Sequence, residues 1–388
     1  MKILMISKNV PTRYQGGIQT HVWKLSKYMI RQGHDVDILS AGGFKQGDKS
    51  YEEDGRTIHE IRYLPGRHIP VLNVLLEDYS FNKSVIQWIK KNGQNYDLIN
   101  VQGRSGFFYP KFNRFGMFPP CITTFHGTAQ GEYEANREFA SNRLALYLHN
   151  LFSSKNERDC LKYSAAVISV SNEMTQRLNK EFGKSLNKSQ IIYNGIDLED
   201  FVELKEKQDD NLLVFVGRLA AVKGVNVLIN SFTKVNKEIK LVIVGGGPDE
   251  KQYKELVAQL NLTNRITFAG AQPFSEVRKW FQKCYAFVLP SFKESQGIVL
   301  MEANAFGKPV IASDIDGINE VVEHNVNGLM FEKSNEKELT EKINQLFSNK
   351  ELAKKLGQEG KRLMKEKFDW EVLTKETLKL YAKVIDKN

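Results

Sequence analysis

The chain of 388 residues is too long for one hydrophobic core, because such cores stop growing at about 250–300 residues, so we expect two domains. Its 41% hydrophobic and 26% charged residues, with ten prolines, describe an ordinary globular chain and exclude long disordered or collagen-like portions. The net charge of +9 resides in one half: residues 1–195 hold 26 Lys and Arg against 17 Asp and Glu, whereas residues 196–388 hold 29 of each.

Cysteine usage and hydropathy indicate the compartment. Cys121, Cys160 and Cys284 have no C-x-x-C spacing, which argues against a disulfide framework or a zinc site and favours a reducing cytosol. The apolar start at residues 1–6 is too short for a signal-peptide core, and nowhere do about 18 apolar residues run together. We therefore expect a cytoplasmic protein, either free or bound peripherally to the inner membrane face.

Strand-length apolar runs alternate with amphipathic stretches along the whole chain, which predicts α/β architecture with parallel sheets and crossover helices. In the first half the predicted strands are 2–7, 35–40, 98–102, 122–125, 166–170 and 190–193, and the predicted helices are 18–31, 82–91, 142–162 and 173–182.

The second half repeats the pattern after an acidic, turn-rich linker at residues 199–211. Its predicted strands are 212–216, 240–244, 265–268, 286–289 and 310–312, and its predicted helices are 225–235, 250–260, 277–283, 299–306 and 336–347. Two consecutive doubly wound units are the economical interpretation, and ligands of such sheets bind at the carboxyl ends of strands.

Gly217 and Arg218 directly follow the predicted strand 212–216, and Lys223 comes five residues later, at the start of a helix. A guanidinium and an ammonium at a strand end, beside a helix N-terminus, suit a diphosphate. Each cation alone is more simply a solvated surface charge. Their joint position favours a phosphate site.

Gly245, Gly246 and Gly247 end the next predicted strand. The run lacks the G-x-G-x-x-G order and the later acidic residue of a dinucleotide fold, and glycine turns are common after strands. Its functional interpretation is close approach of the backbone to a nucleotide.

Residues 290–297 form a predicted loop in which Gly297 permits a tight turn. Ile298 and Val299 then begin a helix, whose free N–H groups and dipole favour an anion.

Two glutamates flank that helix start. Glu302 lies one turn inside the helix, where a carboxylate can accept two hydrogen bonds from a ribose diol. Glu294 lies in the loop before it, where it could touch the sugar. Both are alternatively ordinary surface charges, but the succession of strand, loop, glycine and helix favours a site.

In combination these residues resemble the donor domain of retaining GT-B glycosyltransferases, specifically glycosyltransferase family 4. The motifs of that family occur in order over residues 212–331: Gly217-Arg218-Leu with Lys223-Gly224, Gly245-Gly-Gly-Pro248, Pro290-Ser, the spaced pair Glu294 and Glu302, Gly307-Lys-Pro-Val, and Gly317-Ile-Asn-Glu320.

The first half matches the same family more loosely. The segment with Gly16, Gly17 and His21 resembles the glycine-rich loop that approaches the donor phosphates and the acceptor, and His126 resembles the histidine that contacts the transferred sugar. Asn194 also fits the family pattern, and we place it with His21 on the acceptor side.

The resemblance implies a GT-B fold of two Rossmann-like domains facing across a cleft. Residues 1–195 would bind the acceptor, 196–367 would bind the donor, and 368–388 would cross back onto the first domain.

It also implies a metal-independent, retaining hexosyltransferase without a cofactor. Its co-substrate would be a nucleotide diphosphate sugar, with UDP favoured and GDP-mannose as the alternative, and its acceptor a glycan or lipid-linked sugar in polysaccharide or glycolipid synthesis. On this interpretation Arg218 and Lys223 stabilise the leaving diphosphate, while Glu294 and His126 hold the sugar.

Asp314 and Asp316 form an Asp-x-Asp sequence of the kind that holds a metal in the other major transferase fold. Because it follows a strand of the donor-domain pattern, we interpret it as a loop leading to Gly317.

The segment 107–118 mixes aromatic residues with Lys111 and Arg114, and Lys83, Lys90 and Lys91 lie on a nearby predicted helix. This composition suits anionic lipid headgroups, although the aromatics could instead pack a crossover helix.

Three other functions remain as alternatives. A sugar-nucleotide epimerase of GT-B fold would need no acceptor, and a sugar-binding module would not need all four of Arg218, Lys223, Glu294 and Glu302. A nucleic-acid binder is suggested by charge alone, and we expect no nucleic-acid partner.

Overall fold

The computed structural model describes residues 1–11, 16–42, 47–64, 73–136, 142–183, 188–201 and 206–387. The chain forms two compact units. Unit 1 comprises Met1–Tyr193 with Trp370–Asn388, and unit 2 comprises Asn194–Asp369. The predicted boundaries, 195/196 and 367/368, differ from these by two residues each.

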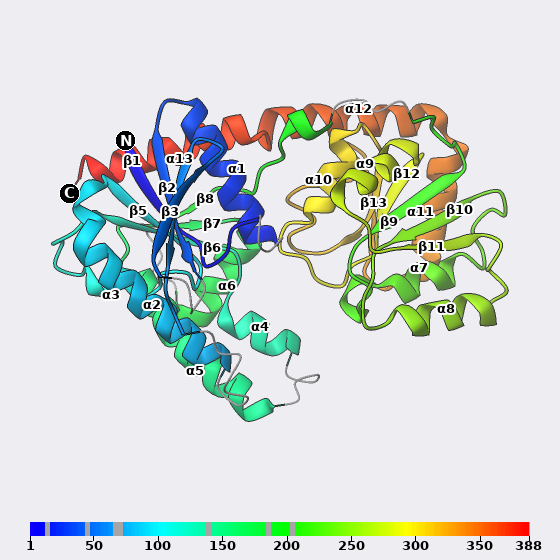
Figure 1. The fold of residues 1–388 in the computed structure, drawn as a ribbon. Coiled ribbons are helices and arrows are strands. Elements are labelled where there is room, and N and C mark those ends of the chain that lie inside the picture. Colours follow the sequence, from blue (N-terminus) through cyan, green and yellow to red (C-terminus); the bar gives the residue numbers. More distant parts are fainter. Residues whose placement is uncertain are drawn as a thin grey trace. The chain divides into compact units, whose positions relative to one another are not determined.

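Unit 1 contains an eight-stranded sheet in the order β3-β4-β2-β1-β5-β6-β7-β8, in which only the edge strand β3 is antiparallel to its neighbour among the described strands (Figure 1). The strands are β1 (Lys2–Ile6), β2 (Asp35–Ala41), β3 (Lys49–Glu53), β4 (Arg56–Ile61), β5 (Leu98–Gln102), β6 (Cys121–Phe125), β7 (Ala166–Ser169) and β8 (Ser189–Ile191). The helices are α1 (Gly17–Arg31), α2 (Asn73–Asn92), α3 (Tyr109–Phe112), α4 (Ala129–Asn136), α5 (Arg143–Tyr163), α6 (Asn172–Phe182) and α13 (Trp370–Ile385).

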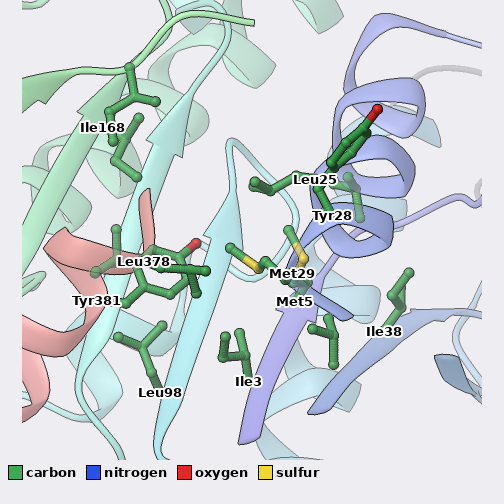
Figure 2. Packing of buried hydrophobic residues seen from close by; sticks show 14 of the residues in the cluster. Ile3, Met5, Leu25, Tyr28, Met29, Ile38, Leu98, Ile168, Leu378 and Tyr381 are labelled. Carbon is green, nitrogen blue, oxygen red and sulfur yellow. The ribbon is translucent and has the colours of Figure 1, made fainter. Parts of the chain in front are cut away.

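Alternating residues of β1 supply the cores on the two faces of this sheet. Ile3 and Met5 pack with α1 and α13, and Leu4 and Ile6 pack with α2 and α3. A parallel sheet covered on both faces needs such continuous apolar strands. Figure 2 shows Tyr381 and Leu378 of α13 directed toward the cluster that contains Ile3 and Met5. The C-terminal helix is therefore part of the core of unit 1, as predicted.

Unit 2 has a parallel six-stranded sheet in the order β11-β10-β9-β12-β13-β14. Its strands are β9 (Leu212–Val216), β10 (Lys240–Val244), β11 (Ile266–Gly270), β12 (Ala286–Leu289), β13 (Val310–Asp314) and β14 (Gly328–Glu332). Its helices are α7 (Val225–Ser231), α8 (Glu250–Gln259), α9 (Phe274–Lys283), α10 (Ile298–Ala305), α11 (Glu336–Ser348) and α12 (Lys350–Lys367), and the 3-10 turns η3 (Leu198–Phe201) and η4 (Ala221–Lys223) precede them.

The strand order of unit 2 reverses between β9 and β12. The chain proceeds from β9 to β10 and β11 on one side, and returns to β12 on the other side of β9. The carboxyl ends of β9 and β12 therefore border the topological switch point, where ligands of doubly wound sheets bind.

The hairpin of β3 and β4 is absent from the prediction, as is strand β14. Charged residues dominate β3, which removes the apolar run used to recognise strands, but Asp54 and Gly55 at the turn both have positive φ (50° and 75°). An Asp-Gly pair with this conformation is a typical hairpin turn, so that dipeptide was the available signal.

Among the described residues, no helix combines the length and the apolar character that crossing a membrane requires.

Candidate active site

The switch point of unit 2 is bordered by the two loops that hold the predicted donor residues. Gly217 and Arg218 follow β9, and residues 290–297 follow β12. Phe292 N–H donates to the carbonyl of Val222 (2.8 Å), which ties the β12 loop to η4. The sheet thus brings these segments together although more than 70 residues separate them in sequence.

Lys223 and Glu294 form an ion pair in this crevice. The Nζ atom of Lys223 lies 2.5 Å from Oε1 of Glu294, and the hydroxyl of Ser291 donates to the same oxygen at 2.9 Å. Both charged side chains are mostly buried. The pair places an ammonium and a carboxylate side by side, where one can meet a phosphate and the other a sugar hydroxyl.

Gly224 allows this close approach. Its backbone is left-handed (φ 64°), and a Cβ atom there would lie 2.0 Å from the carbonyl oxygen of Pro290. No other residue type can occupy the position without displacing the β12 loop. Glycine therefore sets the distance between Lys223 and the loop that carries Glu294.

The predicted glycines after β9 and β10 hold these two loops together. Gly217 N–H donates to Val244 O (3.0 Å), Gly245 N–H donates to Gly270 O (2.8 Å), and the carbonyl of Gly246 accepts from Leu219 N–H (3.0 Å). These backbone N–H and C=O groups are already hydrogen-bonded within unit 2. The role of Arg218 and Lys223 in binding a diphosphate stays a prediction.

Helix α10 begins at Ile298, with Gly297 as its N-cap in a left-handed conformation (φ 67°). Ile298 is exposed and Val299 is half-buried at this helix start. Its N-terminus has no side-chain cap. The helix thus begins at Ile298, as the loop and helix pattern predicted, one residue before the predicted range 299–306.

Glu302 lies one turn into α10 and is half-buried. Burial, together with the nearby carboxylate of Asp200, raises the pKa of Glu302 to about 8. A ligand that donates hydrogen bonds to this carboxyl group lowers its pKa, because such donors stabilise the ionised form.

Asn194 binds Gln296, the residue before Gly297. Its backbone N–H and its Nδ2 donate to Oε1 of Gln296 (2.9 and 2.7 Å), and Nε2 of Gln296 donates to Asn194 O (3.0 Å). Both residues are buried in unit 2. Asn194 thus supports the loop that follows β12, and its acceptor-side role stays a prediction. The role of Gln296 could not be predicted from the sequence, because its partner is 102 residues away.

In unit 1, His126 follows β6 and contacts the last residue of β5. Nε2 of His126 lies 2.7 Å from Oε1 of Gln102. Nε2 of Gln102 donates to Oδ1 of Asn100, whose own amide donates to Ile122 O (3.2 Å). This series of hydrogen bonds leaves Oε1 of Gln102 as an acceptor toward His126. Nε2 of His126 therefore carries the proton, and Nδ1 of the neutral ring is an acceptor.

Burial is the main cause that lowers the pKa of His126 well below its ordinary value, and the neighbouring His21 lowers it further. The ring is therefore neutral at pH 7. A neutral imidazole with Nδ1 as acceptor suits a sugar hydroxyl. Gln102 and Asn100, which orient the ring, were not predicted from the sequence.

His21 lies on α1, whose N-cap is Gly16 and whose first residue is Gly17. The His21 ring is buried and meets the His126 ring edge-on, with centroids 4.6 Å apart. It also contacts the ring of Trp370 (5.2 Å) at the start of α13. The structure therefore joins two predicted residues, His21 and His126, in unit 1. Residues 12–15 of the same predicted loop lie outside the described residues.

The aromatic segment 107–118 divides between core and surface. Phe107 and Tyr109 are fully buried, whereas Phe115 and Met117 are 73% and 60% exposed. Packing of the interior accounts for the first two, and contact of the exposed part of the segment with lipid stays a prediction.

Asp314 is the last residue of β13, and its Oδ1 accepts a hydrogen bond from Asn319 Nδ2 (2.8 Å). Strand β13 therefore extends two residues beyond the predicted end at residue 312, so the loop prediction is wrong for Asp314, whereas Asp316 lies in the loop that leads to Gly317.

Comparison with known proteins agrees with this arrangement. The family model for Glycosyl transferases group 1 matches residues 197–363, and the model for Glycosyltransferase Family 4 matches residues 15–200. An uncharacterized glycosyltransferase of Methanocaldococcus jannaschii is 31% identical over 395 residues, covering 100% of this chain and 99% of the relative.

Two solved structures share the fold. Sucrose-phosphate synthase from Thermosynechococcus elongatus has a TM-score of 0.82 at 21% identity and covers 100% of both chains. HepE of Anabaena in complex with UDP has a TM-score of 0.72 at 18% identity, covering 98% of this chain and 99% of that one. The chain therefore belongs to glycosyltransferase family 4 and has the GT-B fold.

Proposed function

We propose that this glycosyltransferase moves a hexose from a nucleotide diphosphate sugar to a glycan or lipid-linked acceptor, with retention at the anomeric carbon and without a metal ion. The observation that carries the proposal is the grouping of Arg218, Lys223, Glu294 and Glu302 around the switch point of unit 2. UDP is the favoured nucleotide and GDP-mannose the alternative. The complex of the similar HepE with UDP supports this preference.

Each donor residue has a distinct part in this proposal. Arg218 and Lys223 neutralise the diphosphate as the bond to the sugar breaks, a preorganised electrostatic effect worth about 3–4 kcal/mol per donor. Glu302 accepts hydrogen bonds from the ribose diol. Glu294 and the Nδ1 atom of His126 bind sugar hydroxyls.

The proposed step needs no protein nucleophile. The acceptor oxygen bonds to the anomeric carbon on the face from which the diphosphate departs, the bond between carbon and diphosphate oxygen breaks, and the acceptor proton passes to a diphosphate oxygen. The Oε1 atom of Glu294 already accepts hydrogen bonds from Lys223 and Ser291. A carboxylate oxygen already engaged by two donors is less available for nucleophilic attack, which supports a binding role.

The test is a transfer assay in EDTA with UDP-sugars and GDP-sugars, using glycan and polyprenyl-linked acceptors and mass-spectrometric detection. We expect an acceptor that gains one hexose, release of the nucleoside diphosphate, and an α-linkage from an α-linked donor by NMR. Loss of activity with EDTA and recovery with manganese would contradict metal independence. Conversion of the donor to another free sugar nucleotide without acceptor would identify an epimerase.

A further inference from the structure

Helix α5 of unit 1 carries an exposed stripe of a kind unusual in globular proteins. Its four exposed apolar residues are Leu144 (64% exposed), Tyr147 (46%), Leu148 (37%) and Leu151 (49%). They are spaced by three, one and three residues, so they lie along one side of the helix.

The opposite side of the same turns is buried and polar. His149 contacts Asp78 (3.2 Å), Asn150 donates to Gln130 (3.0 Å), and Ser153 is fully buried. Helices of globular proteins usually bury apolar residues and expose polar ones. The first half of α5 does the reverse, so its apolar side has no counterpart in the core of unit 1.

In the second half of α5, the same side of the helix carries positively charged residues. Its exposed residues on this line are Lys155, Arg158 and Lys162. The two acidic residues of the helix do not offset them, because Glu157 is buried and Asp159 pairs with Lys111 (2.9 Å). We call the seven residues Leu144, Tyr147, Leu148, Leu151, Lys155, Arg158 and Lys162 the α5 face.

A pocket of about 440 Å³ adjoins the α5 face at Lys155. Its lining includes Phe108 and Phe152 together with the cations Lys111 and Arg114. After Arg114 the chain exposes Phe115 and Met117. The guanidinium of Arg114 lies over the ring of Phe115 (4.6 Å). Cations beside exposed apolar side chains match the phosphate and acyl boundary of a lipid layer.

We infer that the α5 face binds an anionic membrane surface, with its leucines at the acyl boundary and its cations among lipid phosphates. The occupant follows from charge complementarity, because the α5 face exposes three cations, while of the two carboxylates of α5 Glu157 is buried and Asp159 is paired with Lys111. The inference rests on the proposed function for its purpose, since docking would bring unit 1 to a lipid-linked acceptor.

Sedimentation with vesicles of equal parts phosphatidylglycerol and phosphatidylcholine, at physiological salt, tests the inference on the full chain. We expect the wild type to sediment with these vesicles and to stay in solution with pure phosphatidylcholine. The triple variant K155E, R158E and K162E should bind at least about 100-fold more weakly, at about fivefold per charge. The double variant L148D and L151D should lose sedimentation.

Matched controls lie in unit 2. The triple variant K354E, K355E and K361E changes three exposed lysines of α12, and F274D changes an exposed aromatic residue of α9. Both should bind vesicles like the wild type. The inference fails if the wild type stays in solution, or if the controls lose binding as strongly as the α5 variants.

Two further measurements distinguish a membrane surface from a second copy of the chain, and loss of docking from loss of folding. Sedimentation velocity without lipid would reveal a dimer that L148D and L151D dissociate, and that result would assign the face to a second copy of the chain. Thermal stabilisation by UDP reports on folding and on donor binding. Retained UDP stabilisation without vesicle binding would overturn only the membrane inference, whereas vesicle binding without any nucleotide effect would overturn only the proposed function.

Discussion

Glu302 is the ionisable side chain whose surroundings give the most direct prediction about donor binding. Its pKa is raised to about 8, so the protonated form dominates at pH 6 and the carboxylate dominates at pH 9. A ribose diol donates hydrogen bonds to the carboxylate and therefore favours the form present at higher pH. Donor affinity should rise with pH up to about 8 and then level off, with proton release on binding near pH 7.

Calorimetric titration of UDP-glucose between pH 6 and 9 checks this prediction, because the diphosphate of that donor does not itself titrate in this range. Glu302→Gln should bind about 10- to 100-fold more weakly at pH 8.5, the loss of a charge-assisted hydrogen bond, and should show no pH dependence. A wild-type affinity that is constant with pH, or a variant with the same pH slope, would contradict the role of Glu302.

Lys223 gives a second prediction at this scale. Lys223→Ala should lower kcat by about 10²- to 10³-fold, as expected for removal of one preorganised group that stabilises developing charge. Lys237→Ala, an exposed lysine after α7, is the matched control and should leave kcat unchanged. Steady-state kinetics with the best donor provides the measurement, and a Lys223→Ala variant with normal kcat would remove Lys223 from the mechanism.

Chemistry-bearing residues in recognisable motifs could be predicted from the sequence, but their supports could not. Lys223 and Glu294 were each predicted, and the structure adds that they form an ion pair. Gln296 and Gln102 are ordinary amides in the sequence. Their roles arise from partners that only the folded chain brings near, Asn194 in one case and His126 in the other.

At the scale of elements, the junction of η4 and α7 depends on Gly224. Gly224→Ala should destabilise unit 2 by about 1–3 kcal/mol from backbone strain alone, and further because the new Cβ atom meets the carbonyl of Pro290. Gly47→Ala has open space around it and normal φ, and should be neutral. Urea unfolding followed by circular dichroism measures both, and equal stability of the two variants would contradict this packing.

Apolar strand runs predicted every described strand except β3, β4 and β14, because a parallel sheet buries both faces and leaves a strong pattern. The pattern fails at the charged edge strand β3. Strand β3 carries Lys49, Glu52 and Glu53 and lies at the edge of its sheet, where one side of the strand remains unpaired. Edge strands tolerate charge, so hydropathy alone does not find them.

At the scale of the whole molecule, α13 joins the end of the chain to the first unit. Trp370, Leu373, Leu378, Tyr381 and Val384 all belong to the core cluster of unit 1. Tyr381→Ala should cost about 3–5 kcal/mol, the usual penalty for truncating a buried aromatic residue. Lys379→Ala on the exposed side of the same helix is the control.

Differential scanning calorimetry provides the measurement for this pair of variants. Tyr381→Ala should lower the melting transition of unit 1 and should leave the stabilisation of unit 2 by nucleotide in place. A Tyr381→Ala variant as stable as Lys379→Ala would show that α13 does not contribute to that core.

We propose that unit 2 binds a nucleotide diphosphate sugar at the switch point between β9 and β12, without a metal. Thermal unfolding in EDTA with UDP, GDP, ADP and their sugar derivatives tests it most directly. At 100 times its dissociation constant, a matching nucleotide should stabilise the wild type by about 2.7 kcal/mol, and should stabilise Lys223→Ala and Glu302→Gln much less at the same concentration. Stabilisation by none of these nucleotides, or equal stabilisation of the wild type and both variants, would contradict the claim.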